Sequence, residues 1–283
     1  MLTKDSRESL AFSLLGPVRA WRGGTELDLG SRQQRTTLAM LLLREGTVAT
    51  LDELISGMWG YEPPRSAVTT IRTYVSRLRG ILDRADADSG TRLHSVGGGY
   101  TLETSVDALD VSRFRRHTTR AAEAARRADW STAAAEQATA LKLWRGQPLA
   151  GTIGPYADGQ RIRLQQLGTA ARIDFLSAQV NLGLHREVLP ELSAMAAAHP
   201  LWEDVQALFM TALYGGGRVG EALEHYRKAR RALVDDLGIE PGVRMRTVHQ
   251  RILASDPSLT TVPPGPVTVL TGRNPSRPPM LLS

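Results

Sequence analysis

Residues 63–82 read PPRSAVTTIRTYVSRLRGIL, and this stretch predicts a single helix. Two prolines cannot lie inside a helix but suit the approach to one, and Ser66 offers an oxygen that could cap the first turn. Apolar residues then recur at spacings of three and four, as they do on one face of a helix. The expected buried stripe consists of Val68, Ile71, Val75, Leu78 and Leu82.

The opposite side of this helix carries short or basic residues. They are Thr69, Thr73, Ser76 and Gly80, flanked by Arg72, Arg77 and Arg79. No acidic residue lies between Glu62 and Asp83. Short hydroxyl side chains allow close approach to a DNA groove, and arginine can reach guanine edges or phosphates. A solvated surface helix is the alternative, and for an isolated helix it would be the preferred interpretation.

Two short alternating segments around three glycines follow the helix. Residues 92–96 (RLHSV) and 100–102 (YTL) flank Gly97, Gly98 and Gly99, a pattern that predicts a β-hairpin. A helix that bears arginines and is followed by a glycine-tipped hairpin is typical of the recognition helix and wing of a winged helix-turn-helix.

Three segments carry a resemblance to a known family: residues 54–60 (LISGMWG), 75–79 (VSRLR) and 96–102 (VGGGYTL). They resemble the OmpR-type DNA-binding domain, and more narrowly its version in the Streptomyces antibiotic regulatory proteins (SARPs). Three later segments resemble the helical bacterial transcriptional activation domain of the same family: residues 143–149 (LWRGQPL), 222–226 (ALEHY) and 237–242 (LGIEPG). The two resemblances follow each other in the order that the family has.

The segments before the helix at 63–82 fit a winged helix. Residues 12–15, 18–21 and 27–29 predict short strands separated by glycine-containing turns, as in the N-terminal sheet of the OmpR-type domain. Residues 31–44 predict a helix capped by Ser31, and residues 50–58 a second one with Thr50 and Glu53 as a capping box. Their expected inward residues are Leu38, Leu41 and Leu42, and Leu51, Leu54, Ile55 and Met58.

The later part of the chain predicts helices only. Residues 113–127 and 131–144 have helical periodicity, with the turn at Asp129 and Trp130. Residues 183–189 and 217–223 share a Gly-x₃-Glu-x-Leu pattern 34 residues apart, which is the tetratricopeptide period. Residues 129–134 look like an earlier, degenerate copy, separated from the second by a glycine- and proline-containing insertion at 146–155.

The expected fold is therefore mainly α with a small β component: an N-terminal OmpR-type winged helix-turn-helix followed by an all-α tetratricopeptide-like domain. We expect a tail at 1–10, the winged helix at 11–104, the helical domain at 105–256 and a proline-rich disordered tail at 257–283.

Composition excludes several classes of protein. The chain has 283 residues, enough for two domains, and its lack of cysteine excludes disulfides and thiolate metal sites. Its longest aliphatic run is too short to span a bilayer, so we expect a cytoplasmic, nucleoid-associated protein. The net charge of +6 lies mostly after residue 104, so bulk charge does not identify a DNA-binding half.

No phosphate loop, nucleophile elbow or paired histidine motif occurs in the sequence, so we expect no catalytic residue, metal, cofactor or enzyme activity.

Position and resemblance together assign the site residues. The residues expected to bind DNA are Thr69, Arg72, Thr73, Ser76, Arg77 and Arg79 on the helix, and Arg92 and Gly98 in the wing. In relatives, the two arginines of the 75–79 motif divide between base edges and phosphates, so Arg77 is assigned to bases and Arg79 to phosphate. Many relatives have an arginine in the wing where this chain has three glycines, and this departure from the family's pattern argues against base contact by the wing.

In OmpR-type activators the loop before the recognition helix can touch RNA polymerase. In this chain the corresponding residues are Trp59, Tyr61 and Glu62, although Trp59 could equally fill the core.

The resemblance implies a sequence-specific transcriptional activator of a secondary-metabolite (antibiotic) gene cluster. Its implied partners are double-stranded promoter DNA, bound as a homodimer on direct repeats near the −35 region, and RNA polymerase including its sigma subunit. One alternative is a repressor or ligand-sensing regulator. Another is a helical scaffold whose winged helix binds protein, against which the acid-free stretch at 63–82 argues.

Overall fold

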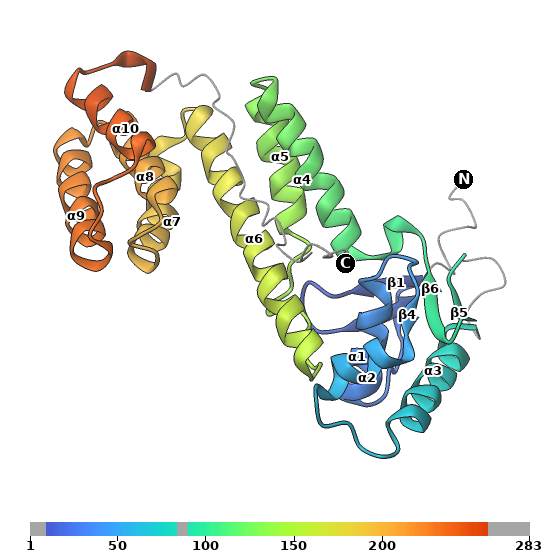
Figure 1. The fold of residues 1–283 in the computed structure, drawn as a ribbon. Helices are drawn as coiled ribbons and strands as arrows, with labels where there is room; N and C mark the ends of the chain where they lie inside the picture. The colour runs from blue at the N-terminus through green and yellow to red at the C-terminus, as the bar shows by residue number, and fades with distance from the viewer. Residues whose placement is uncertain (1–9, 84–89, 260–283) are drawn as a thin grey trace, which may run out of the picture.

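The computed structural model describes residues 10–83 and 90–259, and in them a small β-containing unit is followed by helices (Figure 1). The expected tails at 1–10 and 257–283 lie almost entirely outside the described residues. In chain order the elements are β1 (Leu10–Ser13), β2 (Arg19–Arg22), β3 (Thr25–Glu26), α1 (Arg32–Leu42), β4 (Ala49–Thr50), α2 (Leu51–Trp59), α3 (Ala67–Asp83), β5 (Arg92–Val96), β6 (Gly99–Glu103), η2 (Val106–Ala108), α4 (Asp110–Arg126), α5 (Trp130–Leu141), α6 (Pro155–Asn181), α7 (His185–Ala198), α8 (Glu203–Gly215), α9 (Val219–Leu237), α10 (Val243–Leu253) and η3 (Pro257–Leu259).

The first unit has most of the elements that its sequence predicts, together with the short strand β4, which the sequence does not predict. Strands β1, β2 and β3 form one antiparallel sheet, and β4, β6 and β5 form a second in that order. Ser31 caps α1 by accepting from the Gln34 amide, and Thr50 and Glu53 form the expected capping box on α2. The prediction of a strand at 27–29 is wrong. The strand is Thr25–Glu26, directly after the Gly23-Gly24 turn, and Leu29 is a buried residue outside any strand.

The later helices stack in pairs, as the repeat predicts. Gly183 and Gly217 occupy the turns before α7 and α9 with φ values of 81° and 82°. Ala128, in the turn before α5, has a positive φ of 60° and marks the earlier, degenerate copy. A left-handed residue at each of these turns ends one helix and lets the next one fold back against it. Helices α7–α10 form a bundle at the end of the molecule far from α3 (Figure 1).

The main core does not stop at the boundary expected near residue 104. Buried side chains of the winged helix, such as Phe12 and Leu38, belong to the same cluster as Phe114 of α4 and Leu164 of α6. A second core holds the C-terminal part of α6 together with α7–α10, and includes Leu176 and Leu213. Helix α6 therefore spans both cores, and its first half packs against the winged helix.

Asp110 joins the two expected domains at the start of α4. Its side chain is 2% exposed, and its carboxylate accepts hydrogen bonds from the Leu14 amide at 2.9 Å and the Leu15 amide at 3.0 Å. Burial raises the pKa of the Asp110 carboxyl, and these backbone hydrogen bonds partly offset that rise. Asp110 thus ties α4 to the end of β1.

The loop between α5 and α6, residues 142–154, also attaches to the winged helix. The Leu149 amide donates to the Leu14 carbonyl at 2.9 Å, and the Val18 amide donates to the Ala150 carbonyl at 3.1 Å. The Thr36 hydroxyl of α1 bonds to the backbone of Ile153, 117 residues later. The glycines and prolines of this insertion therefore shape a segment that lines the first sheet.

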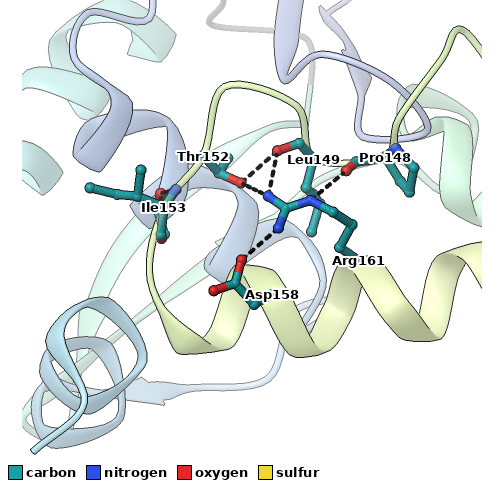
Figure 2. Close-up of polar contacts among 7 residues, drawn as sticks. Pro148, Leu149, Thr152, Ile153, Asp158 and Arg161 are labelled. Atoms are coloured by element: carbon teal, nitrogen blue, oxygen red, sulfur yellow. Dashed lines mark hydrogen bonds and ion pairs between the residues drawn. The ribbon is translucent and has the colours of Figure 1, made fainter.

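Arg161 holds this loop from the side of α6 (Figure 2). Its guanidinium donates to the carbonyls of Pro148 and Leu149, each at 3.3 Å, and to the Thr152 hydroxyl at 3.4 Å. It also forms an ion pair with Asp158 one turn earlier, at 2.5 Å. One partly buried arginine thus satisfies several backbone and side-chain acceptors of the loop.

Candidate nucleic-acid interface

Helix α3 presents one face to the core and the other to solvent. Its buried residues are Ala67, Ile71, Val75, Leu78 and Leu82. The assignment of Val68 to the buried stripe was wrong, because Val68 is 38% exposed and Ala67 takes its place. At 3.6 residues per turn Val68 lies at the edge of the stripe, in the first turn of the helix.

Five of the expected DNA-binding residues share the exposed face of α3. They are Thr69, Arg72, Thr73, Ser76 and Arg77, and each is exposed. The Thr73 hydroxyl donates to the Thr69 carbonyl at 2.8 Å, so its oxygen can still accept a hydrogen bond from a ligand. The structure thus brings short hydroxyl groups and two arginines onto one surface.

Arg72 and Arg77 have no hydrogen-bond or ion-pair partner among residues 10–83 and 90–259. All five guanidinium donors of each are therefore available to a ligand, and arginine keeps its charge at any physiological pH. Arg65 lies just before α3, and it too is exposed and has no partner in that part of the chain. Sequence reasoning missed Arg65, although its place inside the acid-free stretch was a usable signal.

Arg79 is placed differently from these arginines. Its side chain is half-buried, Nε donates to the Leu93 carbonyl at 3.0 Å, and one terminal nitrogen donates to the Ser95 hydroxyl at 3.3 Å. Both partners belong to β5. The phosphate contact expected for Arg79 would have to use its remaining donors.

Two further side chains fix α3 on the rest of the unit. The Tyr74 hydroxyl donates to Oε1 of Gln33 on α1 at 2.5 Å. The Arg22 guanidinium on β2 donates to the Ile81 carbonyl at 2.9 Å, close to the end of α3. A cation at a helix C-terminus also complements the partial negative charge there. The exposed face of α3 therefore has a defined orientation.

The wing, β5–β6, turns at Gly97 and Gly98. Their φ values of 52° and 83° are both positive, as a two-residue type I′ hairpin turn requires. Gly98 is exposed at this tip, whereas Arg92 pairs in register with Glu103 at the other end of the hairpin. Arg92 lies about 13 Å along the strand from Val96, and Gly98 lies beyond Val96 in the turn, so the two wing residues expected to bind DNA are at opposite ends of the hairpin. The tip has no cationic side chain.

The loop between α2 and α3 exposes an aromatic residue. Tyr61 is fully exposed and Glu62 is exposed, whereas Trp59 is partly buried against the main core. Gly60 ends α2 with a φ of 65°, and its amide donates to the Ser56 carbonyl at 2.8 Å. Trp59 therefore fills the core, and the exposed side chains of the loop are Tyr61 and Glu62.

Other kinds of site find little support in the geometry. Within residues 10–83 and 90–259, no group of three histidine, aspartate or glutamate side chains could hold a metal ion. None of the described helices has both the length and the apolar character needed to cross a membrane.

Comparison with known proteins matches both parts of the chain. Residues 24–102 match the family described as "Transcriptional regulatory protein, C terminal", and residues 109–253 match the "Bacterial transcriptional activator domain". The chain is 34% identical to the regulatory protein DnrI of Streptomyces peucetius, with 88% of this chain and 94% of DnrI covered. It is 44% identical to the regulatory protein AfsR of Streptomyces coelicolor over 90% of this chain, but it spans only 25% of the length of AfsR.

The fold is also similar to that of a solved structure. Mycobacterium tuberculosis EmbR, in complex with a low-affinity phosphopeptide, superposes with a TM-score of 0.82 at 31% identity. The match covers 89% of this chain and 68% of the EmbR chain.

Proposed function

The chain belongs to the SARP family of transcriptional regulators, which join an OmpR-type winged helix to a bacterial transcriptional activator domain, and we propose from this premise that it activates transcription by binding promoter DNA in a sequence-specific manner through α3. Members of this family are regulators and not enzymes. The proposed targets are the promoters of a secondary-metabolite gene cluster, as the family name implies.

The exposed face of α3 carries this proposal. It combines three short hydroxyl residues with two arginines that have no protein partner in the described part of the chain, and the helix between Glu62 and Asp83 contains no acid. In a major groove, Thr69, Thr73 and Ser76 would contact bases and nearby phosphates. We assign Arg77 to a base edge and Arg72 to a phosphate.

The wing supplies a weaker contact in this proposal. The glycine tip at Gly98 lets backbone approach the minor groove, but offers no side chain to read it. Arg92 lies at the other end of the hairpin, where we assign it to a phosphate. Sequence specificity therefore comes mainly from α3.

Binding of DNA is tested by selecting duplexes from a random pool with the purified chain and measuring its affinity for the selected sequence. We expect a defined motif that occurs as a direct repeat and is bound by two copies of the chain. The selected duplex should be bound at least about 10³-fold more tightly than random duplex at physiological salt. Recovery of no motif, with binding that disappears as salt rises, would contradict the proposal.

Activation is proposed to act through RNA polymerase and its sigma subunit. Tyr61 and Glu62 support this, because a fully exposed tyrosine beside an acid is well suited to a protein contact. Trp59 would contribute by holding the loop in place.

The test is run-off transcription from a promoter with the selected repeat next to its −35 region. The chain should raise transcript yield, and Tyr61→Ala should lower it while leaving the affinity for DNA unchanged. Val68→Ala, an exposed apolar change on nearby α3, is the matched control and should keep activation. A fall in transcript yield on adding the chain would identify a repressor instead.

A further inference from the structure

We propose that Arg79 is a positioning residue that fixes the wing relative to α3, and that it does not bind a DNA phosphate. This inference rests on the proposed DNA-binding function. It separates Arg79 from Arg77, although the two arginines stand two positions apart in the same motif.

The contacts of Arg79 are with backbone and side chain of one strand. Nε donates to the Leu93 carbonyl at 3.0 Å, and a terminal nitrogen donates to the Ser95 hydroxyl at 3.3 Å. Strand β5 is at the edge of its sheet, next to β6 only. Alternate carbonyls on an edge strand have no strand partner, and a buried carbonyl needs a donor. Arg79 supplies the donor for Leu93, whose side chain is 4% exposed.

Two donors on one planar group also set an angle between α3 and the hairpin. A guanidinium holds its N–H groups in a rigid fork, so bonds to both Leu93 and Ser95 fix the position and the direction of β5. An added Cβ at Gly97 or at Gly98 would find no atom within 4 Å among the described residues, so no side chain packs against the tip at these two points. The place of the tip over DNA therefore follows from the places of β5, which Arg79 holds, and of β6, which pairs with β4.

Release of Arg79 to a phosphate would undo this arrangement. The Leu93 carbonyl would lose its donor, and the hairpin would lose its two-point attachment to the last turns of α3. Arg72 and Arg77, by contrast, can bind DNA without giving up any partner in the described residues. The chain thus has free arginines for DNA and one arginine committed to its own wing.

The salt dependence of binding distinguishes the two roles. Each phosphate contact contributes a slope of about −0.9 in log affinity against log salt, whereas a positioning residue contributes none. Four variants are compared on the selected duplex: Arg79→Ala, Arg79→Lys, Ser95→Ala and, as the phosphate control, Arg72→Ala. Hydroxyl-radical footprints on the same duplex report whether the wing still covers the adjacent minor groove.

We expect Arg79→Lys and Ser95→Ala to weaken binding about 2- to 10-fold, the effect of losing one or two hydrogen bonds, and to lose the wing footprint. Their salt slopes, and that of Arg79→Ala, should equal the wild-type slope. The slope of Arg72→Ala should be smaller in magnitude by about 0.9, the contribution of one phosphate contact. A slope reduced by about 0.9 in Arg79→Ala with the wing footprint intact would overturn the inference. So would wild-type affinity in Arg79→Lys.

A measurement without DNA keeps this inference distinct from the proposed function. In the free protein, Arg79→Lys should speed hydrogen exchange at the amides of β5 and β6, while Arg77→Lys should not. If no variant or wild-type protein binds any duplex, DNA binding fails, but faster exchange would still support Arg79 as the attachment of the hairpin. Unchanged exchange in Arg79→Lys would overturn the positioning role in either case.

Discussion

Arg161→Met tests how firmly the helical domain is attached to the winged helix. Methionine keeps the apolar stem of the side chain and removes the guanidinium. Among the described residues Arg161 is the one donor to the buried Pro148 carbonyl, so this carbonyl loses its partner, at a cost of about 1–3 kcal/mol. The Leu149 carbonyl keeps a bond from the Thr152 hydroxyl at 2.6 Å, so its loss is smaller. The ion pair with exposed Asp158 adds at most about 1 kcal/mol.

The free energy of unfolding should therefore fall by about 1–4 kcal/mol in Arg161→Met. Urea unfolding measures this as a lower midpoint with an unchanged slope. Arg163→Met is the matched control, because Arg163 is exposed on the same helix and, among the described residues, bonds only to Gln160. It should change the free energy of unfolding by no more than about 0.5 kcal/mol. Equal stabilities of the two variants would refute the idea that Arg161 holds the α5–α6 loop in place.

Three further predictions concern single residues. Arg77→Ala should weaken binding to the selected duplex by about 1–3 kcal/mol and relax specificity at one base position, whereas equal losses on selected and random duplex would contradict base contact. Burial and nearby Lys228 lower the pKa of His225 to about 4, below its value in the unfolded chain, so its contribution to stability is complete above about pH 6.5 and is lost as the pH falls toward 4. Since His225 is partly exposed, we expect about 1–2 kcal/mol of this loss between pH 7 and 5 in urea unfolding, and the loss should be absent in His225→Gln. Gly99→Ala should lower the free energy of unfolding by about 3 kcal/mol, because its Cβ would lie 2.3 Å from the Ala49 carbonyl oxygen. Gly98→Ala places its Cβ near no described atom and should lower the free energy of unfolding by about 1 kcal/mol, because an alanine is strained in the left-handed backbone. Equal urea midpoints of the two variants would contradict this reasoning.

Sequence reasoning worked best where the determinants are local. The cap at Ser31 and the capping box at Thr50 each depend on residues three positions apart, and the wing turn depends on two adjacent glycines. The exposed face of α3 follows from helical periodicity alone. Such patterns specify an element and which of its sides is buried, but not what it packs against.

The contacts that sequence reasoning missed join residues far apart in the chain. Asp110 bonds to Leu14, 96 residues earlier, and Thr36 bonds to Ile153, 117 residues later. Strand β4 has only two residues, too few to show an alternating pattern, and it exists because it pairs with β6. The partners of Arg79 on β5 likewise depend on the packing of the hairpin against α3, which no spacing within 75–79 reports.

A footprint of the purified chain on the promoters flanking its own gene, at a low and a high salt concentration, tests most directly whether α3 reads DNA sequence. We predict protected direct repeats beside a −35 region that persist at high salt, because base contacts by α3 do not depend on counterion release alone. Diffuse protection that disappears at high salt, or no protection at either concentration, would contradict the assignment of α3 as a sequence-reading helix.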